Sequence, residues 1–110
     1  VGGGEAARAS EERPGSLGVR GRTLFYAATE VSLTESQALL AKVLVDNFGE
    51  MVGREFAIVS VSVNAELAER AKTQLDAWVH KLSVTLVEKD IPVRIVTHGR
   101  TGFTMRRAVT

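Results

Sequence analysis

Apolar residues recur along the chain with two different periods, and these periods predict its secondary structure. Helical spacing of Leu40 and Leu44 predicts a helix over residues 33–50 with one buried face. Ser32 and Glu35 have the spacing of a capping box, so we expect the helix to begin beside them.

A second helix is predicted after Asn64, whose side chain suits the N-cap position. One apolar stripe continues along it through five residues at helical spacing: Leu67, Ala71, Leu75, Trp78 and Leu82. Residues 82–87 either prolong this helix to about Lys89 or form a short strand that turns at residues 88–90. Leu86 continues the stripe, which favours the helix.

Three further segments have the composition of strands. Residues 23–29 form a β-rich run, and residues 54–63 alternate apolar residues with Ser60 and Ser62. Residues 91–97 are predicted to form another strand. Pro92 is acceptable near its start, where no backbone donor is needed. Residues 103–109 fit either a last strand or a short helix.

The first twenty residues mix Gly, Ala, Ser, Pro and charge without an apolar period. We therefore expect a flexible tail over residues 1–21 and a single domain over residues 22–110. The tail has no apolar core like that of a secretory signal. Val1 at the start fits either removal of an initiator Met or processing of a precursor.

The predicted order is β-α-β-α-β followed by one final strand or short helix. Strands that alternate with helices favour an α/β fold. We expect a small sheet of three to five strands, parallel in part, with two main helices.

Composition excludes several classes of protein. The chain has 110 residues, no Cys and two His. It therefore forms no disulfide, thiolate zinc site or iron–sulfur cluster. Its apolar runs are too short to span a membrane, so we expect no membrane partner and a protein of the cytoplasm or, after processing of a precursor, of an organelle matrix. No nucleophile and base, carboxylate pair or metal cluster has credible spacing, which predicts a non-catalytic protein.

The net charge of +1 hides an uneven distribution. Residues 1–24 carry +1, residues 25–88 carry −4 and residues 89–110 carry +4. The positive charge of the last segment fits either an ordinary solvated surface or a face that binds anions or RNA.

A turn rich in glycine follows the predicted strand at residues 91–97. Gly99 and Gly102 are three residues apart, and such a turn lets backbone amides converge on a phosphate. The same residues also suit a plain hairpin turn. Both interpretations stay open at this point.

Two segments resemble the universal stress protein family. Residues 97–103, Thr-His-Gly-Arg-Thr-Gly-Phe, are similar to its Thr-His-Gly-Arg-Thr-Gly-Leu loop, and residues 27–32, Ala-Ala-Thr-Glu-Val-Ser, to its first strand and turn, Val-Ala-Thr-Asp-Gly-Ser. Glu30 replaces the family's Asp, and the chain is shorter than the family pattern. The resemblance implies a divergent homodimer or assembly subunit with a weakened pocket for ATP. Its residues would be Glu30, Ser32, His98, Gly99, Arg100, Thr101 and Gly102.

Two alternatives come from the same elements. If residues 103–109 are a strand, the order β-α-β-α-β-β resembles the carboxy-terminal domain of translation initiation factor three and the Alba chromatin family. This resemblance implies RNA or DNA binding by a basic C-terminal hairpin that carries Arg94, Arg100, Arg106 and Arg107. The other alternative is a structural subunit that joins a protein partner. A helix over residues 103–109 would favour the nucleotide pocket instead.

Overall fold

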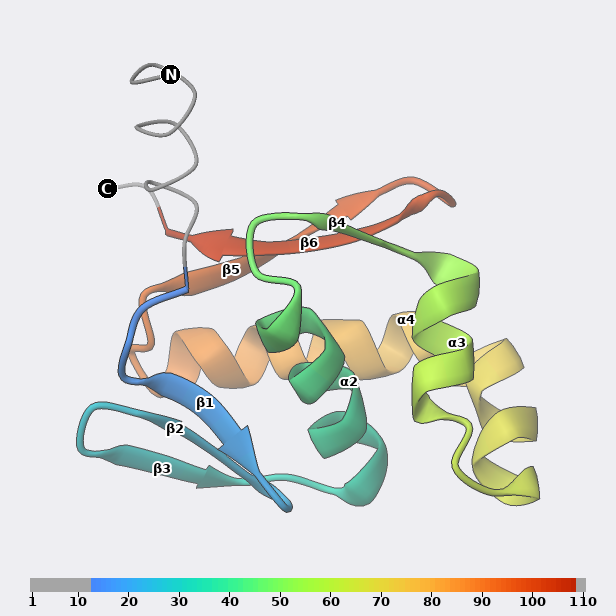
Figure 1. Cartoon of the computed structure of the whole chain (residues 1–110), viewed down its shortest axis with the longest axis horizontal. Coiled ribbons are helices and arrows are strands. Elements are labelled where there is room, and N and C mark those ends of the chain that lie inside the picture. The colour runs from blue at the N-terminus through green and yellow to red at the C-terminus, as the bar shows by residue number, and fades with distance from the viewer. Residues whose placement is uncertain (1–12, 109–110) are drawn as a thin grey trace.

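The computed structural model describes residues 13–108, which form three helices and two antiparallel sheets (Figure 1). The helices are α2 (Glu35–Asp46), α3 (Arg54–Val61) and α4 (Ala65–Glu88). The first sheet contains β1 (Leu17–Arg20), β2 (Thr23–Tyr26) and β3 (Thr29–Ser32). The second contains β4 (Met51–Gly53), β6 (Gly102–Arg107) and β5 (Val93–His98), in that order.

The α/β composition is confirmed, but the predicted sheet is wrong in two respects. There are two separate sheets of three strands, and all of the strand pairs are antiparallel. The single, partly parallel sheet that the alternation of strands and helices predicted is therefore not the one found. Tight connections explain much of the difference, because two-residue turns join β1 to β2 and β2 to β3, a three-residue turn joins β5 to β6, and none of these leaves room for a crossover helix. The chain reaches β6 from β4 through α3, α4 and β5.

The first sheet begins earlier than the sequence suggested. Leu17 in β1 is buried, so part of the predicted tail over residues 1–21 is a strand that packs on α2. Residues 1–12 lie outside the described residues. The predicted strand over 23–29 is in fact β2, a turn at Ala27 and Ala28, and the start of β3. No local pattern marks the turn at Ala27 and Ala28, because neither is a Gly, Asn or Asp residue of the kind that two-residue hairpin turns favour.

Helix α2 contacts both sheets and both other helices. Thr34 caps its first turn by accepting a hydrogen bond from the amide of Gln37 at 3.3 Å. The expected cap, Ser32, lies in β3 instead, and the helix ends at Asp46 rather than at residue 50. Seven of its twelve residues are buried, since neighbours cover it on several sides: Ser36, Ala38, Leu40, Ala41, Val43, Leu44 and Val45.

The strand predicted over residues 54–63 is wrong, because most of this segment is the helix α3. Tertiary contacts override the β-propensity of the segment. Arg54 donates from its backbone amide to the carbonyl of Thr101, and its guanidinium lies 2.6 Å from a carboxylate oxygen of Asp76. Ala57 and Val61, one helical turn apart, are then buried against the other helices.

Helix α4 confirms the longer of the two alternatives for the second helix. Asn64 caps it as predicted, accepting from the amide of Leu67 at 2.8 Å. It runs without a break to Glu88, and the predicted apolar stripe is its buried face. Pairing of residues 93–98 with residues 102–107 then forms the hairpin β5–β6. Residues 103–107 are therefore strand, as one of the two alternatives had it, and Val109 lies outside the described residues.

Gly102 lies where the hairpin meets β4, and a larger residue does not fit there. A Cβ atom at this position would be 2.2 Å from the carbonyl oxygen of Val52. We predict that Gly102→Ala lowers the free energy of unfolding by about 2 kcal/mol or more, because β4 must move away from β6. Urea unfolding followed by circular dichroism measures this. Gly53→Ala is the control, since open space surrounds that position and the loss of a favoured helix-capping Gly costs at most about 1 kcal/mol. Equal costs would contradict the assignment.

Ala27 begins the turn between β2 and β3 with a φ of 53°, in the left-handed region. Hairpin turns of two residues favour Gly at such a position. Ala27→Gly should therefore raise the free energy of unfolding by about 0.5–1 kcal/mol, which is the steric cost of the left-handed Ala less the greater freedom of unfolded Gly. Thermal unfolding of both variants measures this difference. Ala28 has no positive φ, so Ala28→Gly should not raise the free energy of unfolding.

Candidate nucleic-acid interface

The glycine-rich segment is the turn of the hairpin β5–β6. His98 and Gly102 are paired across the two strands, and Gly99, Arg100 and Thr101 connect them. Gly99 has a φ of 58°, and the amide of Thr101 donates to the carbonyl of His98 at 3.0 Å. The segment therefore has the plain hairpin geometry, which was one of its two interpretations.

The residues of the predicted nucleotide pocket belong to different sheets. Glu30 and Ser32 are exposed on β3, in the β1–β2–β3 sheet, whereas His98–Gly102 form the hairpin turn. Figure 1 shows β3 and the far end of the hairpin at opposite sides of the molecule. The structure does not bring these two groups together, and the nucleotide hypothesis stays a prediction without a shared site.

One face of the β4–β6–β5 sheet is packed on the helices, and the other is exposed. Alternation along the paired strands places four buried residues on the inner face: Val52, Val93, Phe103 and Met105. The same alternation places six others on the opposite side, which we name the outer face: Met51, Arg94, Val96, His98, Thr104 and Arg106. All of these except Thr104 are exposed. Figure 1 shows that the helices lie on one side of this sheet.

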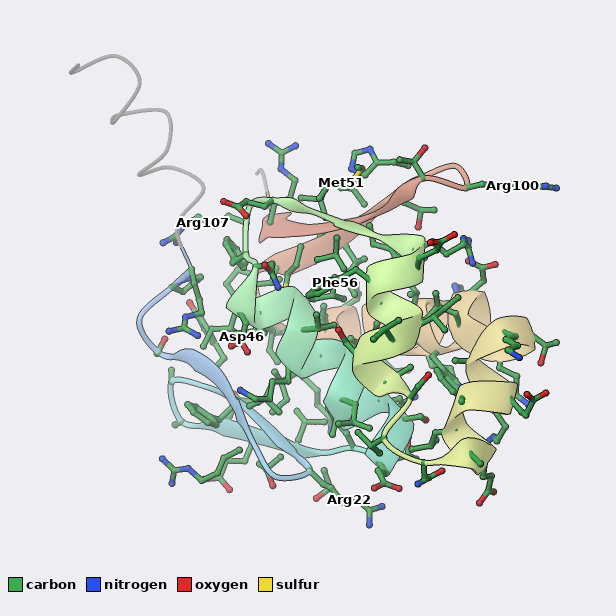
Figure 2. All side chains as sticks on the ribbon, turned by 45° about the vertical axis from the view of Figure 1, so that its right-hand side comes forward. Arg22, Asp46, Met51, Phe56, Arg100 and Arg107 are labelled. Carbon is green, nitrogen blue, oxygen red and sulfur yellow. The ribbon has the colours of Figure 1, made fainter. Side chains whose placement is uncertain are left out.

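The hairpin carries four arginines and no acidic residue between Val93 and Arg107. Arg94 and Arg106 are direct cross-strand partners, so both belong to the outer face. Arg100 extends from the turn, and Figure 2 shows it and Arg107 at opposite ends of the hairpin. Arg107, which pairs with Val93 at the end of β6, belongs by alternation to the inner face, although it is exposed there. Three of the four predicted arginines therefore share one surface or its tip.

An apolar row crosses the outer face next to the two arginines. Met51, Thr104 and Val96 are neighbours on β4, β6 and β5. Thr104 hydrogen-bonds through its hydroxyl to Nε2 of His98 at 2.8 Å, which holds the imidazole over the sheet. Sequence reasoning missed Met51 and Val96, although the alternation Arg94–Val96–His98 already placed Val96 beside the arginine.

A separate groove of about 300 Å³ lies between the first turn of α2 and the middle of α4. Arg70 and Lys81 line it, together with Trp78 and Glu35. Arg70 is already placed, because its guanidinium stacks 5.6 Å from the Trp78 ring centroid and lies 4.0 Å from Glu66. The carboxylate of Glu35 in the same groove disfavours an anionic guest.

Comparison with known proteins assigns no family to the chain. Neither a scan of protein-family models nor a search of curated proteins gives a match for the chain. Within residues 13–108, no helix has the length and apolarity needed to cross a membrane, and no group of His, Asp and Glu has the arrangement to hold a metal ion.

Proposed function

We propose that the chain is a non-catalytic module that binds single-stranded RNA on the outer face of the β4–β6–β5 sheet. The observation that carries this proposal is the basic hairpin, in which Arg94 and Arg106 stand side by side on an exposed face. Phosphate contacts supply most of the affinity of such surfaces. These contacts need cationic side chains that are exposed to solvent.

Arginine suits this role because its planar guanidinium forms paired hydrogen bonds to phosphate oxygens. From the turn to the paired arginines the hairpin spans roughly 15 Å, since each strand residue adds about 3.3 Å. Arg100 at one end and the Arg94–Arg106 pair at the other therefore match an extended strand laid along the hairpin. A flat sheet face accepts such a strand more readily than it accepts the narrow groove of an RNA duplex.

The apolar row gives the bases a surface to contact. Val96 and Met51 offer exposed aliphatic groups beside the arginines, and the His98 ring is the one aromatic group on the outer face. Because aromatic stacking supplies about 1–3 kcal/mol per base, a face with one imidazole should bind with modest sequence preference. The proposed activity is thus mainly electrostatic.

Salt dependence and charge removal test the proposal together. Fluorescence anisotropy with a labelled single-stranded RNA of about 16 nucleotides should show log K falling with log salt at a slope of about −2, from three phosphate contacts. Arg94→Gln with Arg106→Gln should weaken binding about tenfold or more and make the slope shallower by about 1.4. Circular dichroism should show unchanged helix content.

The control removes the same charge elsewhere. Arg20→Gln with Lys72→Gln lies on β1 and α4, and should leave both affinity and slope near those of the unchanged chain. Equal losses in both double variants would reduce the interaction to net charge and contradict the site. Binding of ATP that depends on Glu30 and not on the arginines would instead support the nucleotide hypothesis.

A further inference from the structure

Helix α3 leaves apolar side chains exposed on the face turned away from the other helices. Phe56 and Val59, three residues apart, are 54% and 71% exposed, and Val63 just beyond the helix is 58% exposed. Figure 2 shows Phe56 well away from Arg100, which marks the turn of the hairpin. We call these three residues the α3 stripe.

The composition of α3 makes this exposure a cost to the isolated chain. The helix has eight residues, no side-chain hydrogen bond at its N-cap, and only Ala57 and Val61 fully buried. β-branched residues such as Val59 disfavour helix, and short helices depend on packing rather than on propensity. An element of this kind is stabilised when a partner covers its outer face.

We propose that the α3 stripe is the contact surface of a homodimer, in which two copies of the chain pack α3 against α3 about a two-fold axis near Val59. The three residues expose roughly 300 Å² of largely apolar surface, about the size of the largest patch on a typical monomer, and such patches are often functional. Two copies then contribute roughly 600 Å², and with the usual polar share this gives a total interface of about 1,000 Å². That area is at the lower limit for a specific dimer, so the dimer is weak and depends on concentration.

The order of residues along the stripe favours an antiparallel arrangement with a second copy. With the axis near Val59, Phe56 of each copy lies against the partner's Val63, so that a large side chain meets a smaller one. Glu55, exposed beside the stripe, is then kept apart from the partner's Glu55 at the other end of the contact. A parallel arrangement would place these two carboxylates together.

The surface also differs from the proposed RNA-binding face in its chemistry. Helix α3 has two charged residues, Arg54 and Glu55. Arg54 is paired with Asp76, so Glu55 is the charge beside the stripe. The dimer should therefore persist in high salt, where phosphate contacts weaken. This separates the two proposals experimentally.

Sedimentation equilibrium of the full chain tests the dimer. We expect a monomer–dimer equilibrium that is as strong in 0.5 M salt as at physiological ionic strength, roughly 0.15 M. Val59→Glu should raise the dissociation constant by at least about tenfold, because the interface then buries two carboxylates near its axis. Val87→Glu is the control. Val87 is 53% exposed near the end of α4, and this substitution should leave the dissociation constant unchanged.

A crosslinking measurement covers the case in which Val59→Glu disturbs the helix. The chain has no cysteine, so Ser60→Cys introduces a single thiol beside the proposed axis. A short bis-maleimide should couple Ser60→Cys into dimers, whereas Thr73→Cys on the exposed side of α4 should stay monomeric. A chain that sediments as monomer at all accessible concentrations, or equal crosslinking of both thiols, would overturn the proposal. Loss of RNA binding without loss of dimer would contradict only the proposed function.

Discussion

Burial of α2 between the two sheets is the constraint on which the arrangement of the other elements depends. Leu40, Ala41 and Leu44 have no exposed surface, and the helix contacts β1 on one side and β6 on another. An ordinary surface helix has one apolar stripe, but α2 is apolar on several sides. Other elements must therefore cover it on more than one side. Among residues 13–108, neither small sheet has a second helical layer on its other face.

The proposed RNA-binding surface follows from this arrangement. Since the helices pack on the inner face of the β4–β6–β5 sheet, the alternating residues of β5 and β6 point outward, and Arg94, Val96, His98 and Arg106 among them are exposed. Arg94 and Arg106 are then adjacent because of strand register alone. The three-residue turn over Gly99, Arg100 and Thr101 sets that register, and the missing side chain of Gly102 lets β4 approach β6 from the other side.

Sequence reasoning predicted the elements in which local pattern and tertiary packing agree. The stripe of α4 has a single buried face, and Phe103 and Met105 alternate into the core as the strand alternative required. It failed where the two disagree: residues 54–61 have strand composition but fold as α3, since Ala57 and Val61, one helical turn apart, are buried against the other helices. Pairing of Arg94 with Arg106 depends on register, which no local pattern shows.

Mapping of backbone amide shifts by NMR during titration with single-stranded RNA tests the account most directly. We predict that the perturbed amides fall on β5, β6 and β4, centred on Arg94 and Arg106, with the β1–β2–β3 sheet unaffected. Perturbations centred on Glu30, perturbations spread over α3, or no perturbation at low salt would contradict it.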